Sequence, residues 1–242
     1  MSDASEKVIC IIPAKLGSVR LPRKNLLHLG GISLLGRAID KALCSSLFDY
    51  IHVSSESDEV LSVARDHGID VPFLRPVELS VDPSGVADVC LYVLRKLESE
   101  HKLVFDTLVI LLPTSPFVKI DDLRRAMNIY KKGESKFLMS VVQEEKTVLS
   151  SLVKTEQGLL PLHPDFFFHT GAKKGTHEPN IFRSNGAITI VDVKAFCKVG
   201  DYYGFPISSY EMPAERSLDI DTEYEYLVAQ TIISARPDLL ID

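Results

Sequence analysis

Short runs rich in β-branched residues alternate along the chain with longer stretches that show the apolar spacing of amphipathic helices. This alternation is typical of βαβ units, and it predicts an α/β domain with a mostly parallel sheet flanked by helices. The run Val8 to Pro13 carries no polar residue, as expected for a strand that helices cover on both faces. Further strands are predicted at 50–54, 107–112, 136–142, 187–192 and 205–212, and helices at 34–43, 57–67, 86–97, 121–130 and 222–235.

The region 142–182 departs from this alternation. Its second half is rich in Gly, Pro, His and Lys and contains three successive phenylalanines, Phe166 to Phe168. A long irregular stretch inside a compact domain is usually functional or interfacial. We therefore predict a main α/β domain formed by 1–141 and 183–242, and an inserted arm at 142–182 that serves as a dimer interface.

The charges of the chain are segregated. Its 242 residues carry 27 basic and 33 acidic side chains, and this net charge of −6 disfavours a protein that coats nucleic acid or binds a membrane surface. Residues 7–39 hold six basic side chains and no acidic one, whereas residues 201–225 hold seven acidic side chains and one basic one. Two solvated faces would give this pattern, and so would an anion-binding site that faces a cation-binding site.

Cysteine and histidine spacing excludes two further classes. The four cysteines lie far apart, three of them in apolar patterns, which favours reduced core thiols over a disulfide framework. The seven histidines match no usual zinc-ligand spacing. The polar N-terminus and the short first apolar run match neither a secretory signal nor a membrane span, so a cytoplasmic protein is expected.

A basic loop follows the first predicted strand. Residues 13–25 contain four cations, Lys15, Arg20, Arg23 and Lys24, together with a glycine that permits close backbone approach. Cations at the carboxyl edge of a sheet suit a polyphosphate, although a solvated surface loop would have the same composition. Neither the Walker pattern nor the dinucleotide glycine fingerprint fits this loop, so simple ATPase and NAD-binding functions lose their main support.

A pair of carboxylates lies in the acidic region. Asp219 and Asp221 alternate along an extended segment, which places them on the same side of the backbone. Two such carboxylates can share one Mg²⁺ that also carries phosphate oxygens. A turn or a helix cap explains a lone pair of this kind more often, but the basic loop supplies the second half of a metal-assisted phosphoryl-transfer site.

Taken in order, the motifs of the chain resemble those of the acylneuraminate cytidylyltransferases, which make CMP-activated sialic acids and related nonulosonic acids. In the basic loop, Ser18, Leu21, Pro22, Lys24 and Asn25 match the opening signature of that family. The later motifs follow in the expected succession: Gly31-Ile32-Ser33-Leu34-Leu35-Gly36, Val53-Ser54-Ser55, Leu74-Arg75-Pro76, Pro113-Thr114-Ser115-Pro116, Asn185-Gly186-Ala187-Ile188 and Asp219-Ile220-Asp221. The segment 142–182 matches poorly.

The resemblance implies a nucleotide-binding, Rossmann-like fold of the glycosyltransferase-A type, with a small element that crosses a homodimer interface. It implies that CTP and an acidic nine-carbon sugar react with the help of Mg²⁺, so that the anomeric hydroxyl attacks the α-phosphorus and pyrophosphate leaves. The site residues expected on this basis are Lys24 and Asp221 for catalysis; Lys15, Ser18, Arg20, Lys24, Asn25 and Arg75 for the nucleotide; Asn185 and Tyr203 for the sugar; and Asp219 and Asp221 for the metal.

The chain also departs from the family pattern, mostly at base and sugar positions. Lys15 stands for an arginine and Glu56 for an aspartate, so charge is kept at both positions. Leu112 stands for a glutamine, Val118 for an arginine, and Val86 for a hydroxyl residue, so polarity is lost at all three. The phosphate and metal residues therefore match better than the residues expected to contact the base and the sugar.

Three other functions stay open at the level of sequence. A cytidylyltransferase for 3-deoxy-octulosonate-type acids has a similar loop but matches the later motifs less well. A metal-dependent glycosyltransferase would use an Asp-x-Asp pair without needing the basic loop. A noncatalytic nucleotide-binding homologue is suggested by Leu112, Val118 and Val86.

Overall fold

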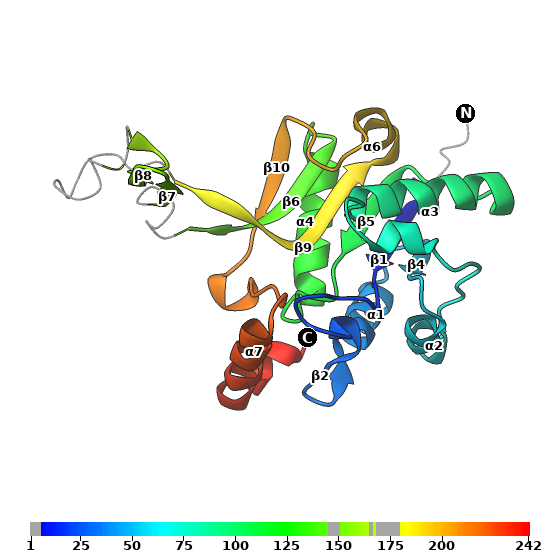
Figure 1. Ribbon diagram of the computed structural model, residues 1–242. Helices are drawn as coiled ribbons and strands as arrows, with labels where there is room; N and C mark the ends of the chain where they lie inside the picture. Colours follow the sequence, from blue (N-terminus) through cyan, green and yellow to red (C-terminus); the bar gives the residue numbers. More distant parts are fainter. Residues whose placement is uncertain (1–5, 145–150, 165–166, 168–179) are drawn as a thin grey trace.

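The computed structural model describes residues 6–144, 151–164, 167 and 180–242. Its centre is a six-stranded sheet with the strand order β10-β6-β9-β5-β1-β4 (Figure 1). The strands are β1 (Val8–Pro13), β4 (Tyr50–Ser54), β5 (Thr107–Leu111), β6 (Phe137–Gln143), β9 (Phe182–Asp192) and β10 (Ile207–Glu211). β1 pairs in parallel with β4 and β5, and β6 pairs in parallel with β10, which confirms the mostly parallel α/β fold.

Helices cover both faces of this sheet, as the apolar run of β1 predicts. α1 (Leu34–Ser45), α2 (Asp58–Asp66) and α4 (Ile120–Lys132) pack on one face, against alternate residues of β1. α3 (Val86–His101) and α6 (Val193–Val199) pack on the other, against the intervening residues Ile9 and Ile11. α7 (Glu223–Ala235) joins Leu21 of the basic loop in a separate small core.

Side-chain caps fix where the helices start. Ser33 accepts a hydrogen bond from the Gly36 amide at the start of α1, as its type predicts, and Thr222 and Glu225 form a capping box on α7. At α4 the sequence favours Asp121 or Asp122 as the cap, but neither occupies that position. Lys119 occupies the N-cap position, and Asp122 accepts the hydrogen bond of the Lys119 amide from within the first turn.

The strand β9 differs most from the sequence prediction. It runs antiparallel to both β5 and β6, and it begins five residues before the predicted strand at 187. The periodicity of one strand carries no information about its direction, so the sequence could not reveal this. Its early start carries the chain outward toward a small hairpin, β7 (Leu152–Thr155) and β8 (Gly158–Pro161), which projects from the sheet (Figure 1).

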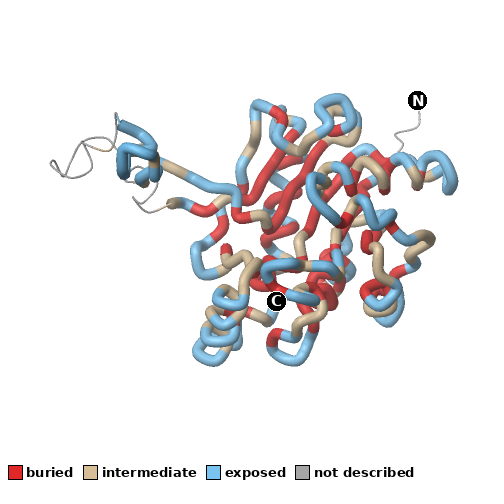
Figure 2. The backbone as a smooth tube through the Cα atoms, viewed as in Figure 1, coloured by how far each residue is buried: buried red, intermediate tan, exposed pale blue. Residues whose placement is uncertain are grey.

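The hairpin is exposed where the sheet is buried (Figure 2). It belongs to the predicted arm at 142–182, whose boundaries stay a prediction. Of the three phenylalanines of that arm, Phe166 and Phe168 lie outside the described residues. Within the described part of the chain, no helix combines the length and the apolarity that crossing a membrane requires.

The four cysteines are free thiols, but only two of them belong to the core. Cys10 and Cys90 are buried, and burial raises the pKa of both thiols. Cys44 and Cys197 are exposed, although the sequence pattern suggested three core positions. Their place at the ends of α1 and α6 explains the difference, because an apolar neighbourhood in sequence does not fix the face of the helix on which a residue lies.

Candidate functional site

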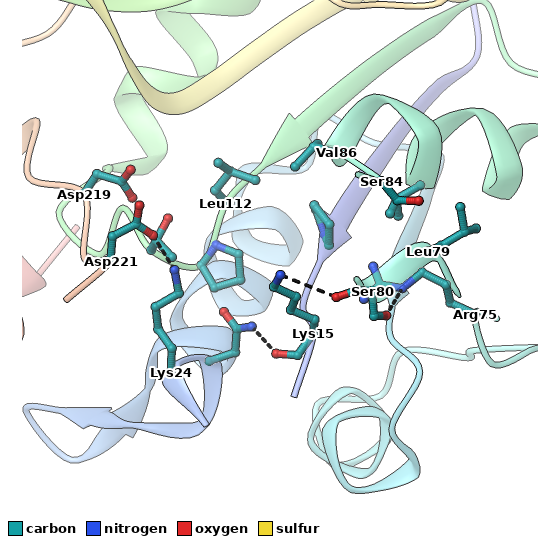
Figure 3. A pocket seen from close by; sticks show the side chains of 16 residues that line it. Lys15, Lys24, Arg75, Leu79, Ser80, Ser84, Val86, Leu112, Asp219 and Asp221 are labelled. Atoms are coloured by element: carbon teal, nitrogen blue, oxygen red, sulfur yellow. Dashed lines mark hydrogen bonds and ion pairs between the residues drawn. The ribbon is translucent and has the colours of Figure 1, made fainter. Parts of the chain in front are cut away.

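A pocket of about 290 Å³ opens at the carboxyl ends of β1 and β5 (Figure 3). In the sheet, β4 pairs with one side of β1 and β5 pairs with the other. The loops that follow β1 and β5 therefore run in different directions and leave a crevice between them. One side of this main pocket carries Lys15, Lys24 and Asp221, and the other carries Leu79, Ser80, Ser84 and Val86. Figure 3 shows Asp219 beside Asp221, and Leu112 between Asp219 and Val86.

The basic loop is folded back on itself by Asn25. This side chain is buried, and its amide nitrogen donates to the Lys15 carbonyl oxygen at 2.8 Å. Lys24 then reaches Asp221, with 2.5 Å between its Nζ and Oδ1, and Arg20 reaches the Oδ2 of the same carboxylate at 2.5 Å. Asn25 therefore shapes the loop, while Lys24 and Arg20 reach the predicted metal carboxylate. Ser18 does not line the pocket; its amide donates to the Leu16 carbonyl within the loop.

The two carboxyls of the Asp-x-Asp motif have opposite pKa shifts. Burial raises the pKa of Asp219, and the charge of Asp221 adds to this, while a hydrogen bond with Thr114 opposes it. Burial also raises the pKa of Asp221, but Lys24 and Arg20 outweigh it, so the pKa of Asp221 is lowered overall. Two cations thus compensate the negative charge of Asp221, whereas the charge of Asp219 is compensated only in part.

These residues fit a divalent metal that arrives with a phosphate ligand. Among the described residues, no three His, Cys, Asp or Glu side chains are grouped to hold a metal by themselves. However, Asp219 Oδ1 is buried and has no hydrogen-bond partner, which is the state expected of an oxygen that awaits a cation. Mg²⁺ is commonly held by one or two carboxylates together with substrate phosphates, and Asp219 with Asp221 supplies that set.

The opposite wall of the main pocket contains Arg75, which the resemblance assigns to the nucleotide. Its guanidinium is only 3% exposed and donates to Glu56 at 2.8 Å and to Ser80 at 3.1 Å. The structure therefore places Arg75 at the pocket wall, with its donors turned to Glu56 and Ser80. Burial lowers the pKa of Arg75, and the neighbouring Glu56 opposes that shift.

A second pocket of about 390 Å³ lies on the other side of Asp219. Its walls include Arg183 of β9, Ser217, Glu225 and Ile232 of α7. Asp219 lines both pockets, so a group bound in one lies close to a group bound in the other. Arg183 is paired with Glu144 across β6 and β9 and is half exposed, which leaves it accessible to an anion.

The structure does not bring the two predicted sugar-binding residues to either pocket. Asn185 is buried, and its amide bonds to Ser140, Ala187 and Ser217 within the protein. The left-handed backbone conformation at this turn belongs to the next residue, Gly186, with φ +71°. Tyr203 lies in the loop before β10, beside the amino ends of β6 and β10, which is the edge of the sheet opposite the main pocket.

Of the three positions that depart from the family pattern by losing polarity, two line the main pocket. Leu112 and Val86 face it, whereas Val118 is buried in the core beneath α4. All three suggest an altered pocket at the level of sequence, because a sequence shows which residue stands at a motif position but not which way its side chain points. Val118 is a core residue, and nothing about the pocket follows from it.

Three residues of the site were not singled out from the sequence. Thr114 opposes the rise in the pKa of Asp219, and its carbonyl oxygen accepts the Ile220 amide at 2.8 Å. Glu56 was noted only as a departure from the family pattern, and Arg183 was not noted at all. Thr114 stands in the Pro-Thr-Ser-Pro motif and Arg183 two residues before Asn185, so the motifs marked both neighbourhoods without marking the residues.

Comparison with known proteins agrees with the motifs. A family model for cytidylyltransferases matches residues 9–228. The chain is 30% identical over 237 residues to CMP-N,N'-diacetyllegionaminic acid synthase of Legionella pneumophila, covering 97% of this chain and 100% of that protein. It is 29% identical to pseudaminic acid cytidylyltransferase of Campylobacter jejuni, covering 89% of this chain and 91% of that protein.

The fold also has solved counterparts. The structure of CMP:2-keto-3-deoxy-manno-octonic acid synthetase in complex with CTP matches with a TM-score of 0.69. The match covers 96% of this chain and 100% of that one, at 14% identity, and it supports the fold alone. With the family model spanning all strands of the central sheet and the relatives matching nearly from end to end, the chain belongs to the cytidylyltransferase family.

Proposed function

We propose that this protein transfers CMP from CTP to the anomeric hydroxyl of a nonulosonic acid of the legionaminic, pseudaminic or sialic class, releasing pyrophosphate. The observation that carries the proposal is the position of Asp219 between two pockets. A transferase that joins a nucleotide to an acidic sugar needs two such pockets with the reacting groups at their junction. The two named relatives make a legionaminic or a pseudaminic acid derivative of this kind.

The main pocket suits CTP. Lys15, Lys24 and Arg20 supply cations on the side where the triphosphate would lie, and the loop that carries them follows a buried strand. The opposite side offers Leu79 and Val86 as apolar walls for a base, with Ser80 and Ser84 as hydrogen-bonding groups. The charged and apolar parts of the pocket thus match the charged and apolar parts of a nucleotide.

The second pocket suits the acid. Arg183 can pair with a carboxylate once it exchanges its contact with Glu144, and an exposed ion pair of this kind costs little to open. Ser217 and Glu225 offer groups for the hydroxyls of a sugar. This pocket replaces Asn185 and Tyr203, the residues expected from sequence, as the proposed acceptor site.

In the proposed reaction, the anomeric oxygen forms a bond to the α-phosphorus, and the bond from that phosphorus to the bridging oxygen breaks. Pyrophosphate leaves with the bonding electrons, and the proton of the hydroxyl passes to water near the Asp219–Asp221 pair. Lys24 and Arg20 exchange Asp221 for phosphate oxygens and hold them in line. Bound Mg²⁺, which Asp219 and Asp221 would hold, supplies positive charge to the phosphates.

The arm gives the proposal a partner, a second copy of this chain. The projecting β7–β8 hairpin exposes four apolar side chains, those of Leu152, Val153, Leu159 and Leu160. Moving apolar side chains out of water lowers the free energy, so an exposed group of them favours an interface. A homodimer in which this hairpin packs on the partner would cover them. Sedimentation of the whole chain and of a Leu159→Glu variant tests this, because the variant is expected to dissociate and the unchanged protein is not. A monomeric unchanged protein would contradict the dimer.

The activity is tested by incubating the protein with CTP, Mg²⁺ and a panel of acids while measuring pyrophosphate release. The panel contains a legionaminic, a pseudaminic and a sialic acid, together with 3-deoxy-octulosonate. Release with a nonulosonic acid and not with the octulosonate is the expected result. Release only with the octulosonate would move the substrate to the shorter acids, and no release with any acid would contradict an enzyme of this kind. The proposed location of the protein is the cytoplasm, because the reaction requires CTP.

A further inference from the structure

Glu56 joins two segments that form opposite walls of the main pocket. It lies two residues after the end of β4, and its side chain is 13% exposed. Its Oε1 accepts the amides of Leu16 at 2.8 Å and Gly17 at 3.4 Å, both in the basic loop. Its Oε2 accepts the Arg75 guanidinium and the Ser80 hydroxyl, each at 2.8 Å, in the segment on the far side.

The contacts of the neighbouring residues extend this link. The Arg75 amide donates to the Ser55 carbonyl at 2.8 Å, so the far segment is tied to the end of β4 as well. Lys15 Nζ lies 3.5 Å from the Ser80 carbonyl, where Figure 3 shows it reaching across the pocket floor. A single carboxylate at the end of one strand therefore lies at the junction of the loop that carries the cations and the segment that carries Ser80.

The charge of Glu56 is held in place by these bonds. Burial raises its pKa, but the hydrogen bonds from backbone amides, Ser80 and Arg75 outweigh burial, so the pKa is lowered overall. Hydrogen bonds to an ionised carboxylate are shorter and stronger than neutral ones. Replacing Glu56 by a neutral group would leave the nearly buried guanidinium of Arg75 without its partner, and the two walls would lose their shared anchor.

We propose that Glu56 is a positioning residue of the nucleotide pocket, whose carboxylate sets the distance between the phosphate-binding loop and the base-side segment. The inference rests on the proposed function, because it takes CTP as the ligand that must touch both walls at once. Glu56 itself does not line the pocket; it holds the two segments through its hydrogen bonds with Leu16, Gly17, Arg75 and Ser80.

The test compares a ligand that spans both walls with one that meets only the loop. Mg²⁺–CTP and Mg²⁺–tripolyphosphate are titrated by calorimetry into the unchanged protein and into Glu56→Gln. The affinity for CTP is expected to fall about tenfold, whereas the affinity for tripolyphosphate changes less than about twofold, because tripolyphosphate can follow the loop if the loop shifts. At saturating CTP, kcat is expected to stay within about twofold, so the loss lies in KM.

Controls separate positioning from general damage. Glu100→Gln removes an exposed carboxylate that pairs with Lys96 on α3, and it is expected to leave both affinities unchanged. If Glu56→Gln does not fold, Glu56→Asp keeps the charge but shortens the side chain that reaches both segments, and a smaller, CTP-selective loss is expected. Equal losses for CTP and tripolyphosphate, or no loss, would overturn the inference. Failure of the unchanged protein to bind CTP would overturn the proposed function and this inference with it.

Discussion

The two ends of the main pocket are stabilised in different ways. At the phosphate end, Lys24 and Arg20 are paired with Asp221, and Arg20 is 65% exposed. At the base end, the Arg75 guanidinium is almost completely buried against Glu56 and bonded to Ser80. Each end has a carboxylate that accepts from several donors, Asp221 at the phosphate end and Glu56 at the base end. Of these two, only Asp221 lines the pocket and is accessible to a ligand.

This difference shows which part of the pocket can rearrange. The Arg20–Asp221 ion pair contacts water and contributes little to stability, so Arg20 can exchange the carboxylate for a phosphate at small cost. Lys24 is only 13% exposed, and it keeps an anionic partner when a phosphate takes the place of Asp221. Breaking a buried pair leaves an uncompensated charge and costs far more. We therefore expect the phosphate end to reorganise when CTP binds and the base end to keep its shape, and four substitutions test this contrast.

The largest effect is expected from Asp221→Asn. The substitution removes a predicted metal ligand and leaves Lys24 and Arg20 without an anionic partner, so kcat is expected to fall about 10³-fold. In the absence of metal, the affinity for CTP should not weaken, because the two cations are then free for phosphates. Pyrophosphate release measures the first effect and calorimetry in chelator measures the second.

The matched control for this substitution is Asp58→Asn. Asp58 is an exposed carboxylate that is paired with Arg65 on α2, away from the main pocket. Activity should stay unchanged in this variant. Near-normal turnover in Asp221→Asn would remove Asp221 from the catalytic site, and weaker metal-free binding of CTP would contradict the exchange of partners.

Lys24→Met tests the same end with a smaller expected effect. Loss of a charge-assisted hydrogen bond to a phosphate costs about 2 kcal/mol, so the affinity for CTP should fall roughly 30-fold. Arg20 still offers one cation to the same region, which limits the loss. Calorimetry with CTP and with cytidine distinguishes the phosphate end from the base end of the pocket. The affinity for cytidine should not change, because cytidine has no phosphate for Lys24 to contact. The control is Lys96→Met, at a partly buried lysine that is paired with Glu100 on α3.

The sequence predicted the elements of the fold better than their directions. Apolar runs placed β1, β4 and β5 within a residue of their observed ends, because a buried strand leaves a local trace in composition. The antiparallel direction of β9 depends on the pairing of residues far apart in the chain, such as Leu108 with Val191, and no local pattern records it.

For the site, charge proved more informative than side-chain type. The acid-free loop and the Asp-x-Asp pair do meet, as their opposite charges suggest, with Lys24 on Asp221. Asn185 and Tyr203 have side chains that suit a sugar, but one is consumed by bonds inside the protein and the other lies at the opposite edge of the sheet. Only the three-dimensional pairing of β6, β9 and β10 decides between such outcomes.

Arg183→Met extends the contrast beyond Asp219 to the second pocket. If Arg183 pairs with the carboxylate of the acid, KM for the acid should rise about tenfold while KM for CTP stays constant. Stability should change little, since the Arg183–Glu144 pair is half exposed. The control is Lys136→Met, which removes another exposed ion pair next to the β6–β9 pairing. An equal rise in both KM values would mean that the two pockets do not act separately.

The smallest effect is expected from Leu112→Ala, in the main pocket between Asp219 and Val86 (Figure 3). Leu112 lines the main pocket and packs near Gly186, where an added Cβ would lie 3.6 Å from the Leu112 Cδ1. Because this side chain is only partly buried, truncation should cost about 1 kcal/mol of contact with the nucleoside, or about a fivefold rise in KM for CTP. Tripolyphosphate affinity should not change, since the phosphate end is untouched. If tripolyphosphate affinity falls together with CTP affinity, the two ends are coupled through Leu112 and the contrast between a rigid and an exchangeable end does not hold.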